Sequence, residues 1–119
     1  MRKRLLFLLR QAPYAGSNAL EALEAALVAG VFDQNVSVLF KDDGVWQLAK
    51  DQDGSRLGTR TVSKVASALP EYEITDLYVC AESLSRRSLH LPDLALIVTA
   101  VTVEEQRALI EAQDAVLND

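Results

Sequence analysis

The feature that most constrains the fold is an unbroken apolar run at residues 5–9, which lies between basic residues on both sides. A run of this length is far shorter than the ~18 residues that cross a bilayer, and it is typical of a β-strand covered on both faces. Proline and glycine follow at residues 12–16 and predict a turn. We therefore expect the chain to begin with a central strand of a parallel sheet.

An alanine-rich helix and a second strand are predicted next. Asn18 and Glu21 have the spacing of a capping box at the helix start, and Gly30 stands where a residue with left-handed backbone would end it. Val36, Val38 and Phe40 alternate with Ser37 and Leu39, which predicts a strand. Strand, helix and strand make a βαβ unit, whose crossover is right-handed in nearly all proteins.

The remaining residues continue this alternation. The expected elements are a short helix packed on the sheet at 45–48, a mobile loop at 51–60, a helix at 62–69 ended by Pro70, a strand at 77–80, a helical turn or two at 81–89, a strand at 94–99, a helix at 102–112 opened by a Thr102/Glu105 capping box, and a last strand at 115–117. Four or five strands and about four helices predict an α/β fold with one doubly wound, mostly parallel sheet. We expect residues 1–119 to form a single domain, because no repeat or linker interrupts the pattern.

Charge and cysteine content exclude several classes of protein. The net charge of −5 argues against direct nucleic-acid binding, which needs clustered cations. Cys80 is the only cysteine, so no internal disulfide can form. Neither a secretory signal nor a membrane-spanning run is present, and we expect a cytoplasmic protein without membrane contact.

Cys80 is the candidate site residue. It lies between a predicted strand and a predicted helix, where free backbone N–H groups stabilise a thiolate or persulfide anion. Arg86 and Arg87 follow and would add positive potential. The alternative is a small buried apolar residue, since free cysteines are often buried. Both interpretations stay open at this point.

Other candidate sites have simpler interpretations. His90, the only histidine, precedes Leu91 and Pro92 in a predicted loop, so we expect neither a Cys/His dyad nor a metal site. Glycine-rich phosphate loops are absent, so we expect no cofactor. Ser17 and Asn18 stand at a helix start, a position that can bind an anion weakly, but helix capping alone explains them. Asp42 and Asp43 are interpreted as solvated turn residues, and Trp46 as a residue of the core or of a subunit interface.

Several local motifs taken in order resemble one known family. They are Ala-Pro-Tyr at 12–14, Val-Leu-Phe at 38–40, Asp-Gly-Val-Trp-Gln-Leu at 43–48, and Leu-Tyr-Val-Cys-Ala-Glu-Ser-Leu at 77–84 before the arginine pair. Over nearly the whole chain this pattern resembles the TusC/DsrF branch of the DsrE/F/H sulfur-relay family. Ser88 departs from it, because a glycine commonly follows the arginine pair in that branch.

The resemblance implies a DsrE/F-like fold and a place in a heterohexamer with TusB-like and TusD-like subunits. Such a complex passes persulfide sulfur to a TusE-like acceptor, toward 2-thiolation of the wobble uridine in tRNA. Dsr-type complexes of the same architecture serve sulfur oxidation, and the sequence does not distinguish the two pathways.

The resemblance also implies that the principal relay cysteine belongs to the D/E-type sister subunit. We therefore expect a structural and docking role, without catalysis by this chain alone, and Cys80 is an auxiliary persulfide candidate. A sulfurtransferase acting through Cys80 is the alternative. A small ligand- or phosphate-sensing domain that uses Ser17, Asp42 and Asp43 is a remote one.

Overall fold

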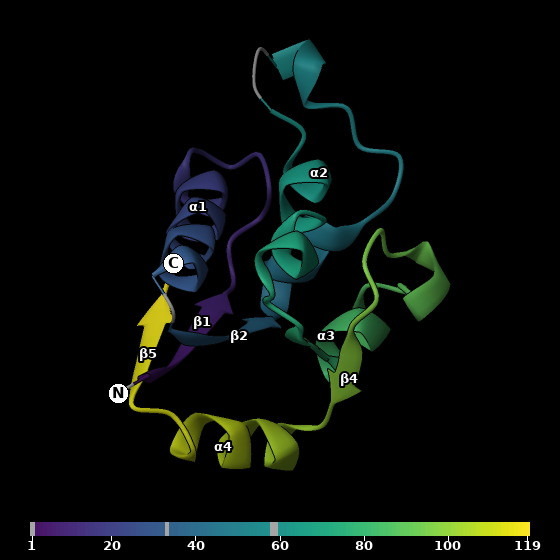
Figure 1. Cartoon of the computed structure of the whole chain (residues 1–119). Helices are drawn as coiled ribbons and strands as arrows, with labels where there is room; N and C mark the ends of the chain where they lie inside the picture. Colours follow the sequence, from purple (N-terminus) through teal and green to yellow (C-terminus); the bar gives the residue numbers. More distant parts are fainter. Residues whose placement is uncertain (1, 33, 58–59) are drawn as a thin grey trace.

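A computed structural model describes residues 2–32, 34–57 and 60–119, which form an α/β fold (Figure 1). Its strands are β1 (Arg4–Leu9), β2 (Asn35–Phe40), β3 (Asp76–Cys80), β4 (Thr99–Val101) and β5 (Ala115–Asn118). Its α-helices are α1 (Asn18–Val31), α2 (Val62–Ala66), α3 (Ala81–Arg86) and α4 (Val103–Glu111). Its 3₁₀ helices are η1 (Asp42–Leu48), η2 (Gly54–Leu57), η3 (Leu69–Tyr72) and η4 (Leu91–Asp93).

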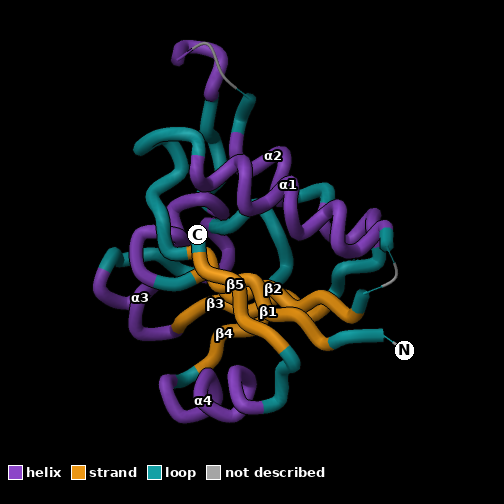
Figure 2. The backbone as a smooth tube through the Cα atoms, turned by 90° about the vertical axis from the view of Figure 1, so that its left-hand side faces the viewer, coloured by secondary structure: helices purple, strands orange, loops and turns teal. Residues whose placement is uncertain are grey.

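The five strands form one sheet in the order β4-β3-β2-β1-β5, and every pair is parallel. Figure 2 shows α1 and α2 on one face of this sheet and α4 on the other. The predicted fold class is therefore confirmed. Because all strands are parallel, their carboxyl ends meet at one edge, where loops from distant parts of the sequence converge.

Two apolar clusters hold the sheet between its helices. The larger cluster joins the sheet to α1, α2 and η1 and includes Phe7, Val38 and Val79. The smaller one lies on the α4 face and contains Leu6, Leu39 and Val101. Since neighbouring side chains of β1 enter different clusters, the strand needs apolar residues at successive positions. This accounts for the unbroken apolar run at its start.

The predicted ends of the first helix were partly wrong. Ser17, and not Asn18, is the N-cap residue of α1, and its Oγ donates a hydrogen bond to Glu21 Oε1 at 2.9 Å. The helix continues through Gly30 to Val31, and Gly30 keeps helical backbone. A Cβ at Gly30 would lie 3.0 Å from Ile74 Cδ1, so the glycine serves close contact rather than a left-handed turn.

The predicted strand at 94–99 was also wrong. Regular strand begins only at Thr99, and the preceding backbone is bonded to the end of η1 instead of to β3. The Ala95 N–H donates to the Leu48 carbonyl at 2.7 Å, and Leu94 forms an isolated antiparallel bridge with Ala49. These contacts hold the segment outside the sheet and leave Ile97 95 % exposed.

Most of the other predicted elements lie where expected, with shorter helices. The helix predicted at 62–69 is divided into α2 and η3, with Pro70 in η3, and the helix predicted at 81–89 ends at Arg86. The capping box of α4 is confirmed, because Thr102 Oγ1 accepts from the Glu105 N–H at 3.2 Å. The loop predicted at 51–60 contains η2, and its residues 58–59 lie outside the described part. No helix in the described ranges is long and apolar enough to cross a membrane.

Candidate functional site

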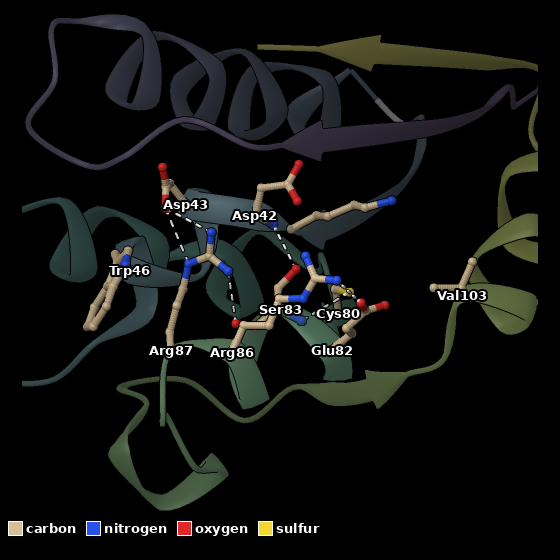
Figure 3. A pocket seen from close by; sticks show the side chains of 10 residues that line it. Asp42, Asp43, Trp46, Cys80, Glu82, Ser83, Arg86, Arg87 and Val103 are labelled. Carbon is tan, nitrogen blue, oxygen red and sulfur yellow. Dashed lines mark hydrogen bonds and ion pairs between the residues drawn. The ribbon is translucent and has the colours of Figure 1, made fainter.

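A pocket of about 540 Å³ opens at the carboxyl ends of β2 and β3 (Figure 3). The end of β3 and the segments that follow β2 and β3 contribute nine of its lining residues, and α4 adds one. The lining residues are Lys41, Asp42, Asp43, Trp46, Cys80, Glu82, Ser83, Arg86, Arg87 and Val103. Residues 11–17, which follow β1, are not among them.

Cys80 is both the last residue of β3 and the N-cap residue of α3. Its Sγ accepts a hydrogen bond from the Ser83 N–H at 3.4 Å. The residue is 2 % exposed, so Cys80 lines the pocket from a buried position and not from the open surface. Cys80 therefore has both the predicted position between strand and helix and the burial that is common for free cysteines.

Opposing effects set the pKa of the Cys80 thiol. Burial raises it, because the thiolate loses its hydration. Hydrogen bonds from the Ser83 hydroxyl and N–H, from the Gln106 amide and from the Glu82 N–H lower it. The hydrogen bonds outweigh burial, and the pKa of Cys80 lies below its ordinary value. Such a thiol is more nucleophilic at neutral pH than its burial alone would allow.

The two arginines that follow Cys80 are each paired with a carboxylate. Arg86 Nη2 pairs with Glu82 Oε1 at 2.5 Å within α3. Arg87 Nη2 lies 2.9 Å from Asp43 Oδ1 and so joins α3 to η1. The expected positive potential at the sulfur is therefore reduced by neighbouring negative charge. Ser83 adds a further link, because its Oγ accepts from the Asp42 N–H at 2.9 Å.

The aspartates at the pocket rim point to different arginines. Asp42 Oδ2 accepts from Arg10 Nε at 2.8 Å, whereas Asp43 binds Arg87. Asp42 also adopts a positive φ of 51°, which turns the chain sharply after β2. In the described ranges no group of three or more His, Cys, Asp or Glu side chains could hold a metal ion.

Three other predicted residues lie apart from the sulfur or differ from expectation. His90 is exposed at the start of η4, where its N–H donates to Asp93 Oδ2 at 2.9 Å, and it does not line the Cys80 pocket. Ser17 caps α1 and contacts Glu21 of the same helix. Trp46 is 38 % exposed on the pocket wall, so it is not a core residue, and its place in a subunit interface stays a prediction.

Gln106 was missed by sequence reasoning. This residue of α4 is 2 % exposed, and its Nε2 donates to the carbonyl of Val101 at 3.2 Å; Val101 pairs with Cys80 in the register of β3 and β4. The available signal was weak: Gln106 lies three residues before the partly buried Leu109, on the face of the helix that meets the sheet. A single glutamine at such a position does not by itself reveal what it contacts.

The chain is similar to known proteins over nearly its full length. The model of the DsrE/DsrF-like family matches residues 3–118. A "Protein TusC homolog" of Pseudomonas aeruginosa is 40 % identical over 117 residues, which cover 98 % of each chain. An "Intracellular sulfur oxidation protein DsrF" of Allochromatium vinosum is 40 % identical over 115 residues, which cover 95 % of this chain and 85 % of that protein. The crystal structure of the ychN protein from E. coli covers 100 % of both chains with a TM-score of 0.87 at 16 % identity, which is a likeness of fold.

Proposed function

The chain belongs to the DsrE/DsrF-like family, and on this basis we propose that it acts as a TusC-like subunit of a sulfur-relay complex. The observation that carries this proposal is the 40 % identity to a TusC homolog across 98 % of both chains. A match of this extent leaves no large segment unaccounted for.

The role proposed for the chain within the complex is structural and docking. Several large apolar side chains are exposed in the described residues, among them Phe32 at 71 % and Ile97 at 95 %. Exposed apolar side chains of this kind favour burial against another protein chain. His90 lies outside the Cys80 pocket, so the pocket does not contain a histidine base within its lining. These features support a subunit that completes a complex with TusB-like and TusD-like chains.

Copurification tests the docking role. The chain is expressed together with a TusB-like and a TusD-like chain, with an affinity tag on the TusD-like chain only. All three chains are expected to elute together at the size of a hetero-oligomer. A Cys80→Ser variant should assemble equally well, because the buried cysteine is not an exposed contact residue. Elution of this chain as a free monomer would overturn the proposal.

The pathway that we propose is 2-thiolation of the wobble uridine of tRNA, with a TusE-like protein as the next sulfur acceptor. The similarity to the TusC homolog supports this pathway. The DsrF relative, which is also 40 % identical to this chain, supports sulfur oxidation as the alternative. Mass spectrometry of tRNA nucleosides from a strain that lacks this chain distinguishes them. Loss of 2-thiouridine is expected, and a normal level would contradict the tRNA pathway while leaving the subunit role intact.

A second candidate function is sulfur transfer by Cys80 itself. The observation that favours it is the combination of a pocket over the thiol with a pKa below its ordinary value. In this step the Cys80 thiolate attacks the outer sulfur of a donor persulfide, the S–S bond of the donor breaks, and the donor leaves as its thiolate. The proton on the transferred sulfur stays with it, so no oxidant or reductant is consumed.

Persulfide loading tests this second candidate. The chain is incubated with glutathione persulfide and its intact mass is measured. A gain of ~32 Da is expected on the wild type and none on Cys80→Ser. The absence of an adduct on the wild type would remove Cys80 as a sulfur carrier.

A further inference from the structure

Lys41 is a charged residue of the Cys80 pocket whose side chain has no ion-pair or hydrogen-bond partner within the described part of the chain. The three carboxylates that line the pocket are instead each paired with an arginine. Because each of these pairs is neutral as a whole, the charge of Lys41 stays uncompensated among the described lining residues. The pairs are Arg10 with Asp42, Arg87 with Asp43, and Arg86 with Glu82, and Figure 3 shows the last two.

Lys41 and Cys80 lie side by side at the ends of neighbouring strands. Phe40 of β2 is paired with Val79 of β3. One position further along, Lys41 follows β2 and Cys80 ends β3. The backbone of Lys41 is still extended, with a φ of −142° and a ψ of 159°, and its N–H donates to the Leu9 carbonyl at 3.0 Å. Since neighbouring strands are about 4.8 Å apart, Lys41 and Cys80 are close neighbours across the sheet.

The side chains of Lys41 and Cys80 leave the sheet on the same face. Phe40 and Val79 both enter the apolar cluster on the α1 face. Because side chains alternate along a strand, the residues that follow them point to the opposite face. Val101, which is paired with Cys80, lies in the cluster on that opposite face. The nucleophile and the unpaired cation therefore enter the pocket from one side of the sheet.

The helix that covers this face places no carboxylate in the pocket. α4 contributes only the apolar Val103 to the lining. The first turn of α4 holds Glu104 and Glu105, which are exposed and lie outside the lining. Glu105 Oε1 accepts from the Thr102 N–H at 2.9 Å and so closes the helix cap. A negatively charged ligand in the pocket thus meets the lysine while the carboxylates of the lining are held by arginines.

We propose that Lys41 makes the Cys80 pocket selective for negatively charged sulfur donors. The inference rests on sulfur transfer by Cys80, the second candidate function above. In that transfer the negative charge moves from the Cys80 thiolate to the sulfur of the departing donor, which at that moment is still in the pocket. An unpaired ammonium group attracts a donor that carries carboxylates and stabilises the thiolate that leaves.

Lys41 acts on the ligand and not on the ionisation of the thiol. Burial and hydrogen bonds set the pKa of Cys80, and the charge of Lys41 is not among its causes. Removal of this charge should consequently leave the reaction of Cys80 with a neutral reagent unchanged, while the reaction with an anionic reagent slows. This difference separates the selection of a ligand from a general loss of thiol reactivity.

The first test compares methanethiosulfonate reagents that differ in charge: the sulfonatoethyl reagent is an anion, the hydroxyethyl reagent is neutral, and the trimethylammonioethyl reagent is a cation. In each reaction the Cys80 thiolate attacks the sulfenyl sulfur, a disulfide forms, and methanesulfinate leaves. Cys80 is the only cysteine of the chain, so the gain in intact mass reports on this residue alone. Each rate is divided by the rate of the same reagent with the urea-unfolded chain, which removes the intrinsic reactivity of the reagent.

At low ionic strength we expect the wild type to react fastest with the anion and slowest with the cation. Lys41→Gln should slow the anionic reagent by about threefold to tenfold relative to the neutral one, because the unpaired charge is lost. Lys41→Arg should keep the order of the wild type, and Lys41→Glu should reverse it. Salt at about 1 M should remove most of the preference, since it screens charges beyond about 3 Å.

Lys50→Gln is the matched control. Lys50 is an exposed lysine that lines a different pocket, and its substitution changes the net charge by the same amount. Its order of rates should equal that of the wild type. The described structure gives the Lys41 side chain no partner, so the substitutions at Lys41 remove no hydrogen bond, and thermal denaturation should give a Tm close to that of the wild type.

The second test measures sulfur loading. Glutathione persulfide has two carboxylates and one ammonium group, so it is a negatively charged donor. Its transfer to Cys80, followed by intact mass as the ~32 Da adduct forms, should be several-fold slower in Lys41→Gln than in the wild type at low ionic strength. Lys50→Gln should load at the rate of the wild type.

The outcomes separate this inference from the function on which it rests. The same order of rates in the wild type, Lys41→Gln and Lys41→Glu overturns the inference, even if the wild type loads sulfur normally. A wild type in which no reagent reaches Cys80 overturns it as well. A wild type that shows the expected order of rates but takes up no sulfur overturns sulfur transfer by Cys80, and the selection of anions by Lys41 stays supported. Assembly with the sister subunits is measured separately and decides the subunit role alone.

Discussion

Arg87 donates to Asp43 Oδ1 from two nitrogens, Nη2 at 2.9 Å and Nε at 3.2 Å, and this pair joins α3 to η1 across the mouth of the Cys80 pocket. Its Nη1 also donates to the Ser83 carbonyl at 3.1 Å. The Arg87 side chain is 21 % exposed, so the guanidinium is held against the protein and is not free in solvent. The wall of the pocket therefore depends on a contact between segments that follow different strands.

Loss of this contact should reduce stability moderately. Arg87→Gln is expected to lower the free energy of unfolding by about 0.5–1.5 kcal/mol, since one partner is partly buried and the other is exposed to solvent screening. Urea denaturation at low salt measures it. Arg86→Gln is the control, because Arg86 and Glu82 form an exposed pair within α3, and such pairs contribute about 0.5 kcal/mol or less. Equal effects of the two substitutions would contradict a special role for the Asp43 pair.

The lowered pKa of Cys80 predicts a pH-dependent contribution to stability. Between the folded and unfolded pKa values the unfolded chain binds more protons, so unfolding becomes less favourable as pH rises. The stability of the wild type relative to Cys80→Ala should thus increase as pH rises from the folded pKa of Cys80 to the ordinary thiol pKa of about 8.5. The contribution is lost as pH falls through the folded pKa.

Denaturation of both proteins across this pH range measures the difference. Burial and the nearby Asp76 carboxylate raise the pKa of Tyr78, so ionisation of this tyrosine does not interfere at these pH values. A cavity left by the substitution adds a constant offset without a slope. A difference that stays flat or declines with pH would show that the thiolate is not stabilised in the fold.

Gly44 should not tolerate any side chain. It is buried in η1, and a Cβ at this position would overlap the carbonyl oxygen of Leu9, which belongs to the end of β1. Gly44→Ala must push η1 off the sheet and is expected to lower the free energy of unfolding by about 3 kcal/mol. Gly30→Ala is the control, because its Cβ would meet the Ile74 side chain at 3.0 Å and the Tyr72 carbonyl oxygen at 3.4 Å, which is an ordinary van der Waals contact. Thermal and urea denaturation should show a much smaller loss for Gly30→Ala, and similar losses would argue against the close approach at Leu9.

Ser88 adopts a left-handed backbone with a φ of 54° directly after the arginine pair. Side chains with a Cβ are disfavoured in this conformation, and glycine is not. Ser88→Gly is therefore expected to raise the free energy of unfolding by about 0.5–1 kcal/mol, after allowance for the greater freedom of glycine in the unfolded chain. Ser85→Gly, on an exposed helical position, should instead be destabilising. If Ser88→Gly also destabilises the protein, the turn does not carry the strain that its φ indicates.

Local patterns along the chain predicted most of the fold. The apolar run in β1 predicted a strand buried on both faces. This was correct because successive side chains of the strand pack into the two apolar clusters on opposite faces of the sheet. The Thr102/Glu105 capping box marked the start of α4, because its hydrogen bonds join residues three positions apart. The end of a strand before a helix also marked Cys80. Each of these signals is short in range and can be recognised in a few consecutive residues.

Tertiary structure alone decided what surrounds the cysteine. Asp43 meets Arg87, and Val101 lies beside Cys80, only because parallel pairing brings the ends of β2, β3 and β4 to one edge of the sheet. Contacts between distant segments also explain why residues 94–98 are not part of the sheet. Leu94 and Ala95 instead bond to the backbone at the end of η1. Hydrogen bonds between distant residues depend on three-dimensional register, which periodicity along the chain does not encode. The sequence by itself determined that a cysteine would stand between a strand and a helix, and the assembled fold determined which groups surround it.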